Sequence, residues 1–445
     1  MTSPALSYVT GQSDQALIGE TIGANFARTV AEWGDRPGLI VRQQGIRWSY
    51  AELGAKVDAF AAGLLALGLH PGDRVGIWSP NNAEWVITQF ATAKAGLVLV
   101  NINPAYRLSE LEYALNKVGC RALIIATRFK TSDYVGMVNT LAPELAHALP
   151  GRLSAEKLPK LEMVIEINAN PAPGMIPFNS ILDMGAPAHH ERLRDLAGKL
   201  QFDDPINIQF TSGTTGAPKG ATLTHHNIVN NAIAVAACMR FSEQDRLCIP
   251  VPLYHCFGMV LSVLACTSVG AAMVFPGEGF DPVDTLAAVQ AERCTALHGV
   301  PTMFIAELDH PEFSKFDLST LRTGIMAGSP CPESMMTRLI ESGITEMTIA
   351  FCIFCFLPLC QLVSGHATVD VFTSGMGERA NLIVLALWEL ALTATVIFIA
   401  WRLYHGFLGK LGNHEISMLL AIPIWWPYLA ALVPAGVGVI VGLWS

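Results

Sequence analysis

The sequence predicts an α/β fold of layered sheets with flanking helices, followed by an all-α membrane segment of three helices. Three observations lead to this prediction. Strand-like and helix-like stretches alternate from about residue 22 to residue 350. Of the 28 Lys and Arg and the 37 Asp and Glu, only seven lie between residues 348 and 445. Three long apolar runs occupy the same C-terminal part. We therefore expect two domains, 1–347 and 348–445.

The predicted elements of the first domain follow one another in α/β order. Strands separated by helices of about 10 to 15 residues favour parallel pairing in a layered sheet. Asn81 and Asn82 mark a helix start, and residues 168–190, rich in Pro, Gly and Asn, are interpreted as a surface excursion. The pattern resumes at Asp204 and ends at an expected strand, 347–350. Before that excursion the predicted strands are 38–41, 74–78, 97–100 and 122–125, and the predicted helices are 22–33, 53–67, 84–95 and 109–116.

Charge and targeting signals narrow the function classes. The net charge is −9, and acidic and basic residues are interspersed rather than gathered in blocks. A nucleic-acid partner is therefore not expected, because it would require a basic surface. The segment from Met1 to Tyr8 has neither a basic stretch nor an apolar run typical of a secretory signal, which favours a cytoplasmic first domain.

The ten cysteines are scattered and are predicted to be reduced. Most sit in apolar runs, as Cys238, Cys248, Cys256 and Cys266 do, where a thiol acts as a small hydrophobe. The pair Cys352-x-x-Cys355 lies in an apolar run without a second ligand pair. A redox or metal role for it is the less favoured alternative.

The stretch from Ile206 to Gly220 carries the most specific chemistry. An apolar strand, 206–210, precedes a loop with two glycines, four hydroxyls and Lys219, and a helix-like segment begins at Thr224. Glycines let backbone N–H groups converge on phosphate oxygens, hydroxyls add donors, and the lysine supplies a charge. The spacing matches neither a Walker loop nor a G-x-G-x-x-G fingerprint. The alternative, an ordinary Ser/Thr/Gly connection, explains the pattern less well.

This loop resembles the signature of adenylate-forming acyl-CoA synthetases. Further stretches are similar to landmarks of that family, in order and at familiar intervals, over about residues 20–350. The likeness is greatest to medium-chain fatty acyl-CoA ligases. The landmark stretches are 101–107, 110–113, 252–258, 298–304 and 324–330.

The resemblance implies a fatty acid substrate and the cofactors ATP, Mg²⁺ and CoA. His255 would act at the acyl pocket near the substrate carboxylate, as the one catalytic residue expected here. Without the motif, it would be interpreted as a core histidine. The adjacent His225 and His226 open a helix and are interpreted as a solvated first turn. Holding of the β- and γ-phosphates is implied for Thr211, Ser212, Gly213, Thr214, Thr215, Gly216 and Lys219, and lining of the adenine site for Gly328, Ser329 and Pro330.

The sequence departs from the family after the expected strand 347–350. The family continues into a Tyr-Gly-x-Thr-Glu motif, whose ring stacks on adenine and whose Glu helps to hold Mg²⁺. Here Phe351-Cys-Ile-Phe-Cys355 follows, and membrane-like sequence then takes the place of the family's C-terminal domain with its lysine. No residue is therefore assigned to a metal, and we expect the synthetase to be a truncated and inactive or impaired form.

The C-terminal runs fit membrane spans. Residues 347–363 carry no charge, residues 382–401 carry only Glu389, and residues 416–444 carry none. About 17 to 25 apolar residues match a bilayer core, so lipid is an expected partner; a buried core helix is the alternative, chiefly for the first run. No role is assigned to Glu389.

This tail resembles the last three of four spans in the DctQ-type small subunit of TRAP transporters, which take up organic acids. The likeness rests on residues 366–372, 387–389, 400–403 and 422–428. With a cytoplasmic first domain, three spans place Ser445 outside. That arrangement inverts the tail relative to the transporter family, so pairing with a transporter large subunit is not expected.

The sequence therefore favours an ATP-dependent fatty acid–CoA ligase located at the membrane, with its soluble domain in the cytoplasm. One alternative is a membrane subunit of an organic acid transporter. The other is a non-functional gene fusion.

Overall fold

The computed structural model describes residues 16–211, 218–329 and 338, and helical positions, with gaps, between 393 and 408. It divides the chain into two units, Met1–Pro330 and Cys331–Ser445. The expected strand 347–350, the Cys352/Cys355 pair and most of the three apolar runs lie outside the described residues. Among the described residues, no helix is both long enough and apolar enough to cross a membrane.

The second unit is described only at its helical positions, which overlap the expected second span. Several of these positions expose large apolar or aromatic side chains, and Thr393 is buried. The exposed side chains are Ile397, Phe398, Trp401, Tyr404 and Leu408.

A seven-stranded sheet forms one half of the first unit. Its order is β11-β10-β4-β3-β5-β8-β9, and all neighbours are parallel except β10 and β11. The parallel pairing expected from the sequence is confirmed. The strands are β3 (Arg74–Trp78), β4 (Val98–Asn101), β5 (Ala122–Ile125), β8 (Met163–Glu166), β9 (Ile176–Pro177), β10 (Pro205–Thr211) and β11 (Lys219–Thr224).

A six-stranded sheet forms the other half, in the order β15-β14-β12-β13-β1-β2. Only β1 and β2 pair in antiparallel fashion. The strands are β1 (Pro37–Val41), β2 (Ile46–Ser49), β12 (Arg246–Cys248), β13 (Ala272–Phe275), β14 (Ala296–Gly299) and β15 (Thr323–Met326); a separate two-stranded ribbon joins β6 (Arg128–Phe129) and β7 (Ser132–Asp133).

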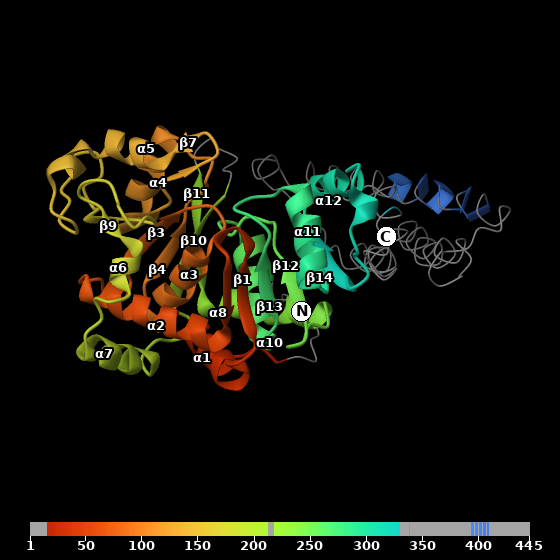
Figure 1. The fold of residues 1–445 in the computed structure, drawn as a ribbon, viewed down its shortest axis with the longest axis horizontal. Helices are drawn as coiled ribbons and strands as arrows, with labels where there is room; N and C mark the ends of the chain where they lie inside the picture. The colour runs from red at the N-terminus through yellow and green to blue at the C-terminus, as the bar shows by residue number, and fades with distance from the viewer. Residues whose placement is uncertain are drawn as a thin grey trace, which may run out of the picture. The chain divides into compact units, whose positions relative to one another are not determined.

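Helices fill the space between the sheets and cover their outer faces (Figure 1). Both faces of a sheet can be covered because successive side chains along a strand point to opposite faces. Leu39 and Val41 of β1 join the central core, whereas Ile40 between them does not. The inner helices are α1 (Ile22–Trp33), α2 (Tyr50–Ala66), α3 (Ala83–Ala95), α8 (His225–Cys238), α10 (Ala265–Val269) and the π-helix η3 (Met259–Leu264).

The outer helices belong to different sheets. On the seven-stranded sheet, a second core cluster packs beneath α4 (Leu108–Val118), α5 (Tyr134–Leu141) and η2 (Pro143–His147). The six-stranded sheet is covered by α11 (Pro282–Glu292) and α12 (Pro301–Leu308). The remaining helices are α6 (Phe178–Ile181), α7 (Pro187–Ala197), α9 (Cys256–Gly258), η1 (Arg42–Gln44) and η4 (Phe313–Lys315).

Local sequence accounts for the helix ends. Ser49 and Glu52 form a reciprocal capping box at the start of α2. The side chain of Asn82 accepts from the Trp85 N–H and caps α3, so the predicted helix start is confirmed. Gly96 ends the same helix with a φ of 71°, a conformation that glycine adopts without strain.

The helix expected from Thr224 is confirmed, because Thr224 caps α8. Strand β11, which precedes this helix and pairs with β10 as a hairpin, was not predicted. The prediction missed β11 because this edge strand is mostly exposed and lacks an apolar face. Residues 168–190 are not wholly a surface excursion, since Ile176, Phe178 and Ile181 are buried in the core.

The interpretation of His225 as a solvated residue is also wrong. Its side chain is 0% exposed, and Nδ1 accepts a hydrogen bond from the Ile22 N–H at 3.0 Å. Burial lowers the pKa of His225 to about 4. The residue ties the start of α1 to the start of α8, a tertiary contact across 203 positions that local spacing does not reveal.

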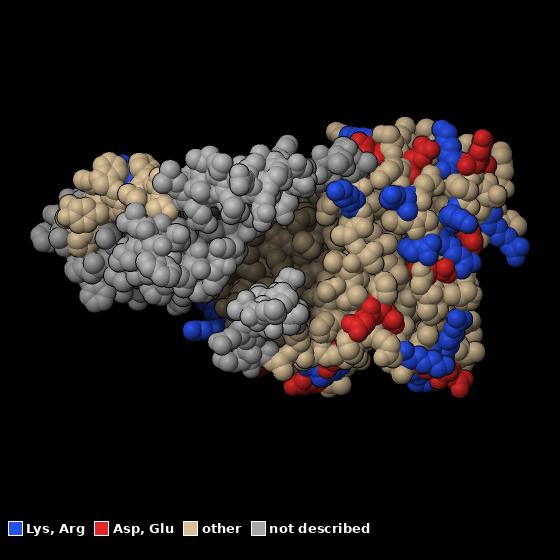
Figure 2. All heavy atoms as spheres, turned by 180° about the vertical axis from the view of Figure 1, so that it is seen from behind, with Lys and Arg blue, Asp and Glu red and all other residues tan. Residues whose placement is uncertain are grey.

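The prediction about surface charge is confirmed, and the prediction about the cysteines holds only for some of them. On the face in Figure 2, acidic and basic side chains are interspersed over the described surface, as expected. Cys248 and Cys266 are buried free thiols, whereas Cys238 and Cys256 are exposed, so the expected burial is wrong for those two.

Candidate active site

The phosphate loop lies at the carboxyl end of β10, next to β4. Thr211 and Lys219 face each other across the hairpin, with Thr211 Oγ1 3.5 Å from the Lys219 carbonyl oxygen. Both residues are exposed. The carboxyl ends of strands in open α/β sheets are where ligands bind. The other five predicted phosphate residues, Ser212 to Gly216, lie outside the described residues.

Helix α4 and the segment just before it contact the β10–β11 hairpin. Tyr113 Oη donates a hydrogen bond to the Pro218 carbonyl at 3.2 Å, and the Tyr106 ring meets the Phe210 ring edge-on. The landmark stretches 101–107 and 110–113 therefore lie beside the phosphate loop. Nothing in their spacing along the chain predicts this contact.

Three buried amides connect the two neighbouring strands. Asn207 Nδ2 on β10 donates to Asn101 Oδ1 on β4 at 3.0 Å, and Gln209 Nε2 donates to Asn207 Oδ1 at 3.2 Å. All three side chains are at most 8% exposed. Buried amides are costly unless they are paired, so this row fixes β10 against β4 with one geometry. The sequence prediction took 206–210 as a plain apolar strand and missed it.

The same row reaches the segment that carries His255. Asn101 Nδ2 donates to the Tyr254 carbonyl at 3.0 Å and lies 3.3 Å from Met259 Sδ. The residue before His255 is thereby connected to the β10–β11 hairpin, which we call the phosphate hairpin, through the side chains of Asn101 and Asn207. These two landmarks, predicted separately, belong to one region of the fold.

His255 is exposed and caps the short helix α9. Its Nδ1 accepts from the Phe257 N–H at 3.1 Å and lies 3.6 Å from Cys256 Sγ. Since Nδ1 accepts, the proton of the neutral ring is on Nε2. Partial burial of the ring lowers the pKa of His255, which favours the neutral form. A neutral imidazole with a free N–H can donate to a carboxylate.

A second histidine, His298, also supports the His255 segment and lies on β14, the strand that pairs with β12. Its Nδ1 lies 2.8 Å from Ser262 Oγ, and the same hydroxyl donates to the Phe257 carbonyl at 2.9 Å. His298 is 0% exposed, and burial lowers its pKa to about 3. The landmark 298–304 therefore contacts the landmark 252–258.

The expected adenine-site residues follow β15. Gly328 has a φ of +94°, and a Cβ there would lie 3.1 Å from Val300 Cγ1, so glycine suits both the backbone and the close approach. Gly328 and Ser329 are exposed, and Pro330 lies outside the described residues. Because β15 pairs with β14, the landmark 324–330 lies beside 298–304.

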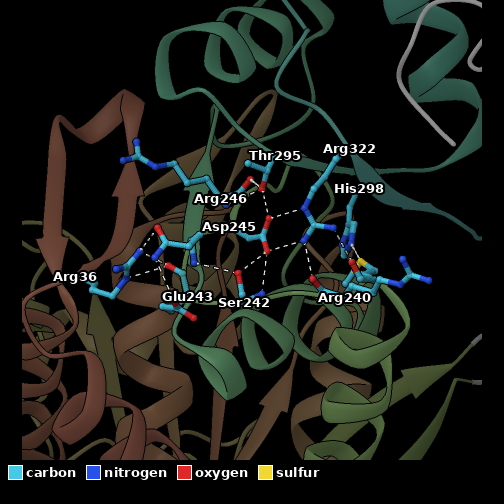
Figure 3. A network of polar contacts seen from close by, with 11 residues as sticks. Arg36, Arg240, Ser242, Glu243, Asp245, Arg246, Thr295, His298 and Arg322 are labelled. Carbon is cyan, nitrogen blue, oxygen red and sulfur yellow. Dashed lines mark hydrogen bonds and ion pairs between the residues drawn. The ribbon is translucent and has the colours of Figure 1, made fainter. Parts of the chain in front are cut away.

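An ion-pair network fixes the start of β15 (Figure 3). The Arg322 guanidinium donates to both oxygens of Asp245, at 3.0 and 2.6 Å, and also to the carbonyls of Met239 and Arg240. Burial raises the pKa of Asp245, but hydrogen bonds from Arg322, Thr295 and Ser242 outweigh it, and the net pKa is lowered. No motif signalled this pair, since the partners are 77 positions apart.

A cavity of about 510 Å³ opens between the carboxyl ends of both sheets. The exposed cations Arg107 and Lys130 contribute to its wall. Within the described ranges, no three His, Cys, Asp or Glu side chains gather as a metal cluster. The remaining polar lining comes from Ser79, Asn81, Asn103, Thr131, Ser132, Tyr254 and Glu278.

Two known families match the chain. The AMP-binding enzyme family matches residues 26–365. The DctQ component of tripartite ATP-independent periplasmic transporters matches residues 335–443, a range almost wholly outside the described residues. The domain boundary expected at residue 347 stays a prediction.

Curated relatives include two of similar identity. The mitochondrial medium-chain acyl-CoA ligase ACSF2 of Danio rerio is 46% identical over 348 residues, which cover 78% of this chain and 57% of that protein. The putative acyl-CoA synthetase YngI of Bacillus subtilis is 47% identical over 336 residues, covering 75% and 61%. The chain thus spans little more than half the length of these relatives.

Solved structures share the fold. The anthranilate CoA ligase AuaEII, in complex with anthranoyl-AMP, matches with a TM-score of 0.63 at 23% identity, covering 74% of this chain and 58% of that one. The N-terminal domain of FACL13 from Mycobacterium tuberculosis matches with a TM-score of 0.61 at 23% identity, covering 74% of each chain. The expected α/β fold of the adenylate-forming N-terminal domain is confirmed.

The match over most of the chain, with landmarks that the fold brings together, places this protein in the AMP-binding enzyme family, close to the medium-chain acyl-CoA ligases.

Proposed function

We propose that the chain is an ATP-dependent fatty acid–CoA ligase whose adenylation chemistry is impaired. One observation supports the ligase assignment. A series of buried hydrogen bonds runs from the phosphate hairpin through Asn207 and Asn101 to the residue before His255. These contacts join the proposed phosphate loop, which follows β10, to the His255 segment, which follows β12. Medium-chain acids are the proposed substrates, by likeness to the relatives.

The proposed reaction joins a carboxylate to the α-phosphate of ATP and releases pyrophosphate. The acyl group then passes from AMP to the thiol of CoA, and AMP leaves. Thr211 to Gly216 and Lys219 hold the β- and γ-phosphates, and Gly328, Ser329 and Pro330 line the adenine site. The exposure of Thr211 and Lys219 at the carboxyl end of β10 fits a phosphate ligand. Mg²⁺ would supply charge neutralisation at these phosphates.

His255 is proposed to orient the acid. Its protonated Nε2 donates to one carboxylate oxygen, while Nδ1 stays bound to the Phe257 N–H. The thiol substrate is proposed to enter by the 510 Å³ cavity, whose Arg107 and Lys130 suit a phosphate-bearing molecule such as CoA.

Impairment is proposed from the residues after position 350. Phe351-Cys-Ile-Phe-Cys355 has no carboxylate where the family places its metal-holding Glu. Loss of one group that stabilises developing charge costs about 10²- to 10³-fold in rate. ATP binding depends on other residues and is expected to survive.

Equilibrium dialysis of ATP against the full chain tests the nucleotide site. Lys219→Ala is expected to weaken ATP binding by about tenfold or more, since a charged hydrogen bond contributes about 1.5 to 3 kcal/mol. Lys199→Ala, at an exposed position before β10, is the matched control and should bind like the wild type. Equal affinity in all three proteins would contradict the proposed phosphate site.

A second candidate function is a membrane subunit of an organic acid transporter, favoured by the DctQ match over residues 335–443. We propose a membrane location with a cytoplasmic first domain and Ser445 outside. Pairing with a transporter large subunit is then not expected. Alkaline phosphatase fused after Ser445 should be active; an inactive fusion on a stable full-length product would contradict this topology.

The non-functional gene fusion remains the third candidate. One long sequencing read across codons 340–370 of the source DNA tests it. A gene fusion requires one continuous reading frame across the junction, so a continuous read would support this candidate and a read that separates the two parts would contradict it.

A further inference from the structure

The backbone that carries His255 is fixed by side chains from distant elements. We call residues 250–258 the His255 turn. Asn81, which follows β3, uses both ends of its amide on this turn: Nδ2 donates to the Val251 carbonyl at 2.9 Å, and Oδ1 accepts from the Leu253 N–H at 2.9 Å. Asn81 is 2% exposed. One buried side chain thus sets the entry to the turn.

A second buried amide acts one residue before His255. Asn101 Nδ2 donates to the Tyr254 carbonyl, while its Oδ1 accepts from Asn207. Asn101 is also 2% exposed. The position of Tyr254, and hence of the next residue, follows the end of β4 rather than the turn's own sequence.

The far end of the turn is closed equally tightly. Ser262 Oγ donates to the Phe257 carbonyl. A Cβ at Gly258 would lie 2.4 Å from the Pro252 carbonyl oxygen, so the turn folds back on itself too closely for any side chain there. Backbone is therefore held before, beside and after His255.

Two side chains of this fixed turn are exposed, those of His255 and Cys256. Each amide satisfies backbone groups of the turn that would otherwise be buried and unpaired, which contributes stability of its own. A functional side chain must also be held within a fraction of an ångström of its working position. The two amides meet this second requirement as well, because they fix the backbone just before the exposed His255 and Cys256.

We propose that Asn81 and Asn101 are positioning residues that fix the His255 imidazole for the acid substrate. This inference rests on the proposed function for the role of His255 itself. Neither asparagine lies in the phosphate loop or in the adenine-site residues.

The chain offers a matched control in Asn230 on α8. Its amide makes the same two-ended clamp on another segment, accepting from the Ile18 N–H at 2.8 Å and donating to the Ile18 carbonyl at 3.0 Å. Asn230 is half-buried and also donates to the His226 carbonyl at 3.0 Å, so Asn230→Ala removes at least as many amide hydrogen bonds at a place away from His255.

Cys256 is a built-in reporter of the turn. We would label the full chain with iodoacetamide and measure each cysteine by mass spectrometry. Asn81→Ala and Asn101→Ala should raise the Cys256 rate about fivefold, the ratio that corresponds to a lost hydrogen bond of about 1 kcal/mol. The exposed Cys238 should react as in the wild type, and Asn230→Ala should leave both rates unchanged.

A spectroscopic readout separates positioning from stability. The His255 ring signal, assigned by its loss in His255→Gln, should titrate differently in the two variants and as in the wild type in Asn230→Ala. Unchanged Cys256 labelling and an unchanged His255 titration in both variants would overturn the proposal. So would equally faster labelling of buried Cys248 and Cys266, because it would indicate a merely structural role.

Octanoate distinguishes this inference from the proposed function. In the wild type, bound octanoate should slow Cys256 labelling, and this protection should weaken in Asn81→Ala and Asn101→Ala. Absence of protection in the wild type would contradict the acid site of the proposed function, whereas the labelling rates without octanoate test the positioning by themselves.

Discussion

Single residues show most clearly what sequence patterns can and cannot reveal. Lys219, Gly328 and His255 are singled out by the sequence because each stands in a dense motif, and their roles stay predictions. Asn81 and Asn101 were noticed only as a helix start and part of a landmark, although each makes long-range contacts to the His255 turn. A buried amide leaves no periodic signal, so its partner has to be seen in the structure.

His225 carries a prediction about acid stability. Its pKa of about 4 in the folded chain is below the ordinary 6.5, so the unfolded chain binds the extra proton more readily. Above pH 6.5 the neutral His225 leaves the free energy of unfolding undiminished. This free energy falls as the pH drops from 6.5 towards 4. The difference between the two pKa values corresponds to about 3 kcal/mol.

Urea unfolding from pH 7.5 to 4 tests this prediction. His225→Gln should flatten part of the acid decline, while His226→Gln, at the half-buried neighbouring position, should keep the wild-type slope. His298, with a pKa of about 3, keeps its own contribution in all three proteins. Identical slopes for His225→Gln and the wild type would contradict the assigned role of His225.

At the scale of elements, regular packing was predictable and edges were not. The central parallel strands β3, β4 and β5 were found from apolar runs, because they are buried on both faces. Strand β11 was missed since it is an exposed edge, and the buried β9 and α6 were missed since Pro and Gly suggested a loop. Edges and short buried turns depend on neighbours far away in the chain.

The strand β15 carries a prediction about the ion pair at its start. Arg322→Leu should lower the free energy of unfolding by about 1.5 to 3 kcal/mol, because it removes charged hydrogen bonds from the 4% exposed Asp245 side chain. Arg28→Leu, which removes an exposed pair with Glu20, should cost about 0 to 1 kcal/mol. Urea denaturation of both variants gives the comparison; equal losses would contradict the structural role assigned to Arg322.

At the scale of the whole molecule, the first unit could be predicted as α/β from alternation alone, and as an AMP-binding fold from its landmarks. The contacts between these landmarks could not be predicted from the sequence. Their contacts run through Asn207, Asn101, Ser262 and His298, and each of these residues has at least one partner 36 or more positions away. The proposed membrane tail still rests on apolar composition and on the DctQ match.

The six-stranded sheet carries a prediction about fragments. Among the described residues, β15 ends this sheet and its side chains are only half buried. An open edge of this kind promotes association between chains. A fragment of residues 1–350 is therefore expected to elute as aggregates in size-exclusion chromatography; a monomer that melts cooperatively would contradict this expectation.

The most direct test of the central claim is pyrophosphate release from ATP and octanoate by the full chain. We predict that ATP binds while pyrophosphate release stays at least about 10²-fold below the ordinary range of about 1 to 10³ per second. Turnover within that ordinary range would contradict the proposed impairment. Failure of ATP to bind at all would contradict the ligase assignment itself.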